Sequence, residues 1–194
     1  MTDKVVRNLI KVPEVTLLFW VIKIAATTLG ETGGDTVSMS MNLGYLVGTI
    51  IFAAIFLVAV AIQMKARGFH PFLYWTTIIA TTTVGTTLAD FADRSLGIGY
   101  AGGSSLLFVL LMVSLAIWYW SLGTVSVNTV STPRSEMFYW TTIMFSQTLG
   151  TALGDWTADS AGLGYSGSAL VFCSLLALIA LAYYWTKLSH TISQ

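Results

Sequence analysis

The chain contains one block of sequence three times in the same register. Each copy begins with a tryptophan, followed by a glycine after 10 residues, an aspartate after 15, a second glycine after 24 and a tyrosine after 25. The tryptophans are Trp20, Trp75 and Trp140; the first glycines Gly30, Gly85 and Gly150; the aspartates Asp35, Asp90 and Asp155; the second glycines Gly44, Gly99 and Gly164; the tyrosines Tyr45, Tyr100 and Tyr165. Chance does not keep five identities in register three times, so the chain is an array of tandem repeats.

The composition indicates that these repeats lie in a membrane. Of the 194 residues, 55% are hydrophobic and only 9% are charged, whereas a soluble domain carries about 25% charged residues. An apolar run follows each repeat tyrosine, and about 20 apolar residues are enough to cross the hydrocarbon core of a bilayer. Each repeat is therefore expected to form two transmembrane helices joined by a short acidic loop. The expected helices cover residues 14–35, 43–65, 71–91, 99–121, 136–156 and 164–186.

These features predict an all-α polytopic membrane protein with six transmembrane helices arranged as three parallel helical-hairpin repeats. The repeats would cover residues 14–65, 71–121 and 136–186 of a single membrane domain, 1–194. Since every repeat has two spans, all three share one orientation and are related by an axis along the membrane normal.

Basic residues predict the orientation, because cytoplasmic loops carry an excess of Lys and Arg. Seven of the nine basic residues fall on one side of the predicted bundle: Lys4, Arg7, Lys11, Lys65, Arg67, Arg134 and Lys187. Arg94 is alone on the other side, and Lys23 lies inside the first span. Both termini are therefore expected in the cytoplasm, with the acidic phrases facing outward. The first span carries the repeat's own motif and no clean cleavage pattern, so it is interpreted as retained rather than as a signal peptide.

Small residues four apart run along the first helix of every repeat. The three sets are Ala26, Gly30 and Gly34; Thr81, Gly85 and Ala89; and Ser146, Gly150 and Gly154. Such stripes let helix backbones approach closely where lipid supplies no hydrophobic force for association. We expect these three helices to form an inner ring, with the apolar second helices outside it.

A polar stripe with the same spacing leads to each repeat aspartate. The stripes are Lys23, Thr27, Glu31 and Asp35; Ile78, Thr82, Thr86 and Asp90; and Ile143, Gln147, Thr151 and Asp155. Residues four apart share a helix face. A carboxylate at a helix C-terminus opposes the helix dipole, and one inside a membrane usually faces a cavity or a partner.

Two interpretations of the aspartates remain open. They could cap the chain locally as it turns back, by accepting hydrogen bonds from loop N–H groups. Alternatively they could converge with Glu31 into an outward-facing cation site, since all-oxygen sites suit protons and hard cations such as Mg²⁺, Mn²⁺ or Ca²⁺. In that hypothesis the metal or cation ligands are Asp35, Asp90, Asp155 and Glu31, supported by Thr27, Thr82, Thr86, Thr151 and Gln147, with Lys23 as a charge partner.

Lys23 is a charge inside a span that neither sister repeat interrupts with one. A charged lysine at the bilayer centre costs at least about 2.5–3.5 kcal/mol on insertion scales. Its side chain could extend back to the cytoplasmic interface, or pair with Glu31 or with an aspartate of another repeat. A Lys–Glu pair would suit proton-coupled transport, and it would equally suit a permanent ion pair that only holds the helices together.

Other classes of function find no support in the residues. The chain has no net charge and no basic patch for nucleic acid. No catalytic triad, phosphate loop or cofactor fingerprint occurs, so neither an enzyme nor a cofactor is expected. No histidine lies near the acidic phrases, which argues against zinc. Three aromatic clusters are expected to anchor the helices at the bilayer interface: Trp118-Tyr119-Trp120, Phe138-Tyr139-Trp140 and Tyr183-Tyr184-Trp185.

The segments "KVPEVTLLFWVIKIAATTLGETGGD", "YWTTIIATTTVGTTLAD" and "FYWTTIMFSQTLGTALGD" resemble a bacterial integral-membrane family known only as uncharacterised membrane-anchored proteins. That family is built from tandem two-helix repeats of unknown function, each with a tryptophan and a Gly-Asp phrase. The resemblance places its tryptophan at Trp20, Trp75 and Trp140 and implies a multi-pass protein of the bacterial inner (plasma) membrane. The family usually shows four repeats and this chain shows three. A homo-oligomer could supply the fourth unit, or three units could form a pseudo-threefold architecture, or the unit could be absent.

The sequence therefore suggests a small transporter or exporter that handles a cation, such as a divalent metal, with proton coupling as an option. The lipid bilayer and a small cation would be its partners. The competing hypothesis is a scaffold or sensor that transports nothing and whose aspartates only cap helix ends. A transporter needs a water-filled path to its carboxylates, whereas a scaffold should bury them in hydrogen bonds.

Overall fold

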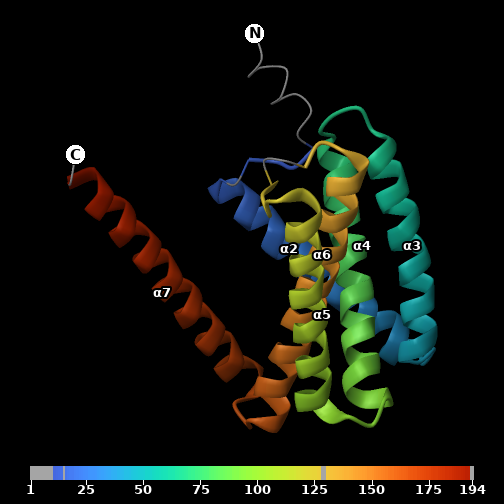
Figure 1. Ribbon diagram of the computed structural model, residues 1–194. Coiled ribbons are helices and arrows are strands. Elements are labelled where there is room, and N and C mark those ends of the chain that lie inside the picture. The colour runs from blue at the N-terminus through green and yellow to red at the C-terminus, as the bar shows by residue number, and fades with distance from the viewer. Residues whose placement is uncertain (1–10, 15, 128–129, 193–194) are drawn as a thin grey trace. The chain divides into compact units, whose positions relative to one another are not determined.

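The computed structural model describes residues 11–14, 16–127 and 130–192, and this part of the chain is all-helical (Figure 1). Its six α-helices are α2 (Leu17–Asp35), α3 (Tyr45–Lys65), α4 (Pro71–Asp90), α5 (Gly99–Leu122), α6 (Pro133–Asp155) and α7 (Gly164–Ile192). They confirm the expected helix pairs, with bounds that differ by at most three residues except where α7 continues beyond residue 186. Pro71 opens α4 at a position where its missing N–H has no helical partner to lose.

The first helix of each repeat does not pass into a loop at its aspartate, as the sequence suggested. The chain continues instead as a five-residue π-helix: η1 (Thr36–Ser40), η2 (Phe91–Ser95) and η4 (Trp156–Ser160). Asp35, Asp90 and Asp155 therefore stand where α-helix changes to π-helix, and none of their side chains makes an N-cap hydrogen bond to the π-helix. Short π-helical segments of this kind occur frequently at functional sites.

The second glycine of the motif has a backbone reason. Gly44, Gly99 and Gly164 have φ values of 80°, 68° and 63°, a region that side-chain-bearing residues rarely adopt. Two positions earlier the chain is again left-handed, with Gly97 and Gly162 both at 70° and Asn42 at 56°. Asparagine is one of the few residues that tolerates this conformation, so all three repeats reverse direction in the same way.

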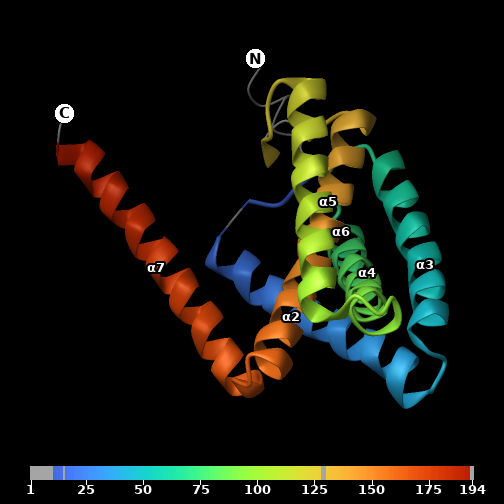
Figure 2. The same ribbon diagram turned by 60° about the horizontal axis from the view of Figure 1, so that its bottom comes forward.

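The chain divides into two units, residues 1–152 and 153–194, and each is described by itself. In the first unit α4 is the central helix and packs against α2 and α3, with α3 beside it in both views (Figures 1 and 2). Residues of α4 are buried almost continuously from Thr77 to Asp90. α5 lies against α6, where the rings of Trp118 and Phe138 stack with centroids 6.4 Å apart.

Polar residues fill the buried helix α4, and its own backbone satisfies most of them. Five of its threonines donate from Oγ1 to the carbonyl oxygen four residues earlier: Thr77, Thr81, Thr82, Thr83 and Thr87. This back-bonding lets hydroxyl groups be buried without partners on other helices. The centre of the first unit is therefore polar in sequence but internally hydrogen-bonded.

An aromatic cluster forms the core at the end of the bundle where α4 and α6 begin. The hydroxyl groups of Tyr74 and Tyr139 lie 2.7 Å apart, and Trp140 packs beside them. Tyr139, Trp140 and Trp118 are 5%, 2% and 3% exposed, so the prediction that their clusters are interface anchors is wrong for these three. Tyr119, Trp120 and Trp185 are exposed, while the side chains of Tyr183 and Tyr184 lie outside the described residues. Spacing placed these aromatics at helix ends but could not show which neighbours cover them.

Three helices are long and apolar enough to cross a membrane: α3, α5 and α7, the last through Ala182. They are the second helices of the three repeats. The first helices, α2, α4 and α6, do not reach that apolarity over the part of the chain described. The helical part of the fold prediction is thus confirmed, with three candidate spans.

The second unit consists of the last residues of α6, η4 and α7. Its corner is held by a hydrogen bond between Thr157 Oγ1 and Ser168 Oγ at 2.8 Å. The same corner in the first and second repeats places Gly48 against Ser38 and Gly103 against Asp93. A small residue therefore occupies this position in every repeat because the π-helix and the following α-helix come together there.

Candidate functional site

Residues of the predicted polar stripes of α2, α4 and α6, the last as far as Thr151, meet inside the first unit. Close approach of α2 and α4 makes this possible, because Gly30 has no side chain: a β-carbon there would lie 2.6 Å from Thr82 Cβ. α6 approaches on another side of α4, where a β-carbon on Gly85 would lie 3.1 Å from Thr148 Oγ1. The small-residue stripes of the first two repeats are buried, which confirms their packing role. The third stripe crosses the boundary between the two units.

Gln147 is the residue on which the three helices meet. Its amide oxygen, Oε1, accepts a hydrogen bond from Lys23 Nζ of α2 at 3.1 Å and another from Thr82 Oγ1 of α4. Thr82 Oγ1 also lies 3.0 Å from the carbonyl oxygen of Ile78, so its one proton has two acceptors. Thr82 and Gln147 occupy equivalent positions, seven residues after the repeat tryptophan. The sequence stripes therefore predicted residues that the fold brings together, although not the partner of Lys23.

The Lys23 ammonium is bound by a neutral amide oxygen. Gln147 Nε2 is buried and, over the part of the chain that the structure describes, has no hydrogen-bond partner. The Lys23 ammonium therefore lies against a neutral oxygen contributed by another repeat.

A second contact joins α2 to α6 two turns higher. Thr151 Oγ1 donates to Glu31 Oε1 at 3.4 Å, with Glu31 exposed and Thr151 half-buried. Thr27, between Lys23 and Glu31 on the stripe, donates instead to the Lys23 carbonyl oxygen at 2.9 Å. Thr86 Oγ1 is buried with no hydrogen-bond partner among the described residues. Glu31 and Thr151 thus come together as the stripes suggest, while the Thr27 hydroxyl is used by its own helix.

The repeat aspartates differ from one another in their surroundings. Asp90 is 1% exposed, and its Oδ1 lies 3.1 Å from Nε of Arg94, one turn further along the chain. The Arg94 guanidinium lies over the rings of Tyr45 and Tyr100, 5.9 and 5.7 Å from their centroids. The tyrosines that close the first two repeats therefore surround the cation that neutralises Asp90.

The predicted ring of three carboxylates stays a prediction. Asp35 is half-buried in the first unit, whereas Asp155 belongs to the second unit. No group of three or more His, Cys, Asp or Glu side chains that could hold a metal occurs in the described residues. The geometry on which a cation site can be built is therefore the meeting point at Gln147.

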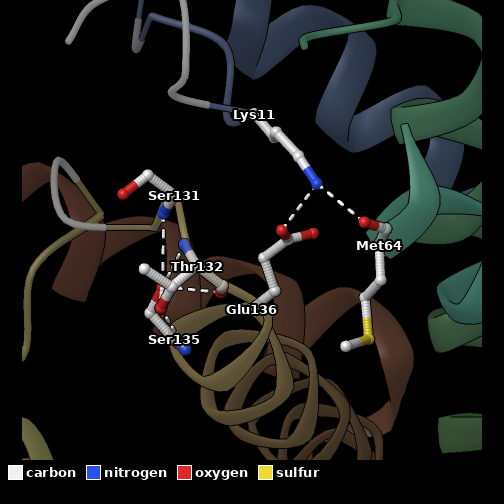
Figure 3. A network of polar contacts seen from close by, with 6 residues as sticks. All are labelled: Lys11, Met64, Ser131, Thr132, Ser135 and Glu136. Carbon is white, nitrogen blue, oxygen red and sulfur yellow. Dashed lines mark hydrogen bonds and ion pairs between the residues drawn. The ribbon is translucent and has the colours of Figure 1, made fainter. Parts of the chain in front are cut away.

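Sequence reasoning missed a buried ion pair at the opposite end of the bundle (Figure 3). Lys11, from the segment before α2, donates to Glu136 Oε1 at 2.7 Å and to the carbonyl oxygen of Met64 at 2.9 Å. The side chains of Lys11 and Glu136 are 10% and 1% exposed. Next to them Thr132 and Ser135 cap α6 reciprocally, since Thr132 Oγ1 accepts from the Ser135 N–H and Ser135 Oγ from the Thr132 N–H. The signal that could have pointed to this pair was Glu136 itself, the acidic residue in the first turn of α6.

The features so far define a class: an all-helical protein of three tandem two-helix repeats, in which the second helix of each is apolar enough to span a membrane. The chain belongs to the family described as Repeat of Unknown Function (DUF347), which matches residues 18–69, 73–124 and 138–189. These limits lie within four residues of the repeats expected from the tryptophan register. Comparisons with curated proteins and with solved structures find no match.

Proposed function

We propose that this protein is a six-span transporter or exporter of a small cation in the bacterial inner membrane, with both termini in the cytoplasm. α2, α4 and α6 would be the inner spans of three parallel hairpins. With 19, 20 and 23 residues and a rise of 1.5 Å per residue, they are roughly 28–35 Å long, enough for the hydrocarbon core. Of the three, α4 is enclosed by its neighbours, and an enclosed helix can carry polar residues that a lipid-facing helix cannot.

The observation that carries the proposal is the shared hydrogen bonding of Lys23 and Thr82 to Gln147 Oε1. An ammonium on a helix of a membrane bundle is expensive, and such residues usually mark an ion or substrate path. Packing alone does not need it, since the equivalent positions of the other repeats are the uncharged Ile78 and Ile143. In the proposed cycle the lysine ammonium occupies the amide oxygen of Gln147, beside the hydroxyl group of Thr82. A cation replaces it there when the lysine withdraws or loses its proton.

Glu31 supplies the negative charge nearest to this position along the stripe. Its contact with Thr151 places a carboxylate between α2 and α6, two turns from Lys23. Asp35 and Asp90 lie further toward the same end, with Arg94 reducing the charge of the second. An approaching cation would meet carboxylates first and neutral oxygens next, an order that attracts a cation without trapping it.

The competing proposal is a scaffold or sensor, and the tight contact of Gly30 with Thr82 favours it. Cation binding to the purified protein, measured by calorimetry with monovalent and divalent ions in turn, separates the two. The transporter proposal expects saturable binding that Gln147→Leu and Asp90→Asn abolish, while the ion-free variants stay folded, with a free energy of unfolding lowered by no more than about 1–3 kcal/mol. Asp159→Asn is the matched control, because Asp159 is an exposed acid outside the stripes. Absence of binding, together with site variants that melt far lower, would leave only the scaffold.

A further inference from the structure

An apolar groove runs along the outside of the first unit between α5 and α6. Its volume is about 370 Å³, within the range of small-molecule sites. Leu110, Val113 and Ile117 of α5 form one wall. Met137, Phe138 and Phe145 of α6 form the other, and Arg134 closes one end. The few other polar groups are hydroxyls such as Ser114, which already pairs with Thr142 at 2.9 Å.

The position of Arg134 fixes the depth of this groove in a bilayer. The contacts of Trp118 with Phe138 and of Ser114 with Thr142 set α5 and α6 antiparallel. Continued by one turn, this register places Arg134 level with the last residues of α5, where Trp120 is 83% exposed. Exposed tryptophan and basic residues at a helix end are typical of the lipid headgroup region.

The length of the groove matches one leaflet. From Arg134 to Phe145 is eleven residues of helix, or roughly 16 Å, about half of the ~30 Å hydrocarbon core. α5 is itself apolar enough to span a membrane, and its exposed Val113 and Ile117 line the groove. Where α5 spans a bilayer, the medium in contact with this surface is lipid, and the groove ends at the depth where an acyl chain of that leaflet would end.

We propose that this groove is a binding site for an anionic phospholipid. One acyl chain lies between α5 and α6, and the headgroup phosphate pairs with the Arg134 guanidinium at the start of α6. Charge complementarity selects this occupant, because the lining of the groove is mainly apolar and its one charged residue, Arg134, lies at the headgroup end. Basic pockets between membrane helices bind anionic headgroups in this way, and the positive end of the α6 dipole adds to the attraction.

The test is native mass spectrometry of the protein equilibrated with equal amounts of phosphatidylglycerol and phosphatidylcholine. The wild type is expected to retain one phosphatidylglycerol in preference to phosphatidylcholine. Arg134→Gln should reduce that retention about fivefold, the effect of one basic residue at an anionic surface. Thr141→Trp should abolish it by filling the groove, since Thr141 lines it. Both residues are exposed, so both variants should fold, as circular dichroism would verify.

Arg67→Gln is the matched control, because Arg67 is an exposed basic residue on the same predicted side and outside the groove. It should retain lipid as the wild type does. Equal retention of the two lipids, or unchanged retention in Arg134→Gln or Thr141→Trp, would overturn the proposal. Equal loss of lipid in Arg67→Gln would also overturn it, because the effect would then come from the overall charge and not from the groove. A wild-type protein that retains no lipid would overturn it as well, since other protein would then cover the groove.

Discussion

The ammonium of Lys23 donates a 3.1 Å hydrogen bond to the amide oxygen of Gln147, which is 124 residues away in the sequence. The first and third repeats are joined by this contact, and Thr82 of the second repeat binds the same oxygen. Each repeat therefore contributes one side chain to a single point inside the first unit. Thr82 and Gln147 occupy equivalent repeat positions, whereas Lys23 comes from the position one turn earlier, which holds Ile78 and Ile143 in the other repeats.

Loss of Gln147 should show whether these groups act together. Gln147→Leu leaves the Lys23 ammonium without its acceptor, and we expect the free energy of unfolding to fall by roughly 1–3 kcal/mol. Lys23→Met in the same chain should recover much of that loss, because the stranded charge is removed. Thermal unfolding of both single variants and the double variant in detergent measures this coupling. Strictly additive effects would mean that the two residues do not interact.

The close approach of α2 and α4 predicts a difference between two neighbouring glycines. Gly30→Ala places a β-carbon 2.6 Å from Thr82 Cβ and 3.0 Å from the Ile79 carbonyl oxygen. Overpacking of this kind typically costs about 1–3 kcal/mol. Gly33→Ala meets no atom within 4 Å and should stabilise α2 by about 0.4–1 kcal/mol through the unfolded state. If the two variants melted at the same temperature, the helix spacing described here would be wrong.

The buried pair of Lys11 and Glu136 predicts that replacing one partner destabilises the protein much more than replacing both. Lys11→Met leaves a buried carboxylate without its cation, and breaking such a pair costs about 3–5 kcal/mol. Adding Glu136→Met to Lys11→Met should return most of the stability, because an apolar pair replaces the charged one. Chemical denaturation of the three variants gives the result. A Lys11→Met protein as stable as the wild type would show that the pair is not formed.

The hairpin corners predict that equivalent glycines respond differently. At Gly103 a β-carbon would overlap the Asp93 carboxylate, whereas at Gly48 its closest neighbours, Ser38 and Thr87, lie 3.4 Å away. Gly103→Ala should therefore reduce the yield of folded protein, and Gly48→Ala should be tolerated. Asp93→Ala should rescue Gly103→Ala by removing the obstructing group. Size-exclusion profiles in detergent report these outcomes, and failure of the rescue would locate the clash elsewhere.

Periodicity predicted the repeats, the helix pairs and the faces of α2, α4 and α6, because helix period and membrane thickness are general constraints. It also placed Lys23, Thr82 and Gln147 on stripes, and these residues meet. The partner of Lys23 could not be predicted, since the stripes contained carboxylates that electrostatics alone would have favoured over an amide. Which stripe residues face each other depends on the approach of helix backbones at Gly30, a tertiary property.

Other features depend on contacts that no spacing rule contains. The π-helices after Asp35 and Asp90 continue the preceding α-helices without a break, and no pattern in the sequence marked where the helix type changes. Arg94 could have been assigned to Asp90 from its i, i+4 position. The surrounding Tyr45 and Tyr100 belong to two different repeats and required the fold. Lys11 lies outside every repeat, so the register could not assign it a partner.

Cation flux tests the central claim most directly. The protein is reconstituted into liposomes loaded with a cation-sensitive dye, and uptake is followed after addition of monovalent and divalent cations in turn. Wild type and the control Lys65→Met, an exposed lysine at the end of α3, should both carry a cation. The variant Gln147→Leu and the double variant Lys23→Met, Gln147→Leu should each lose at least about 90% of the transport rate. Loss of a ligand interaction worth ~1.4 kcal/mol in the transition state would have this effect. Wild-type liposomes that carry no cation, or flux that persists unchanged in Gln147→Leu, would contradict the account.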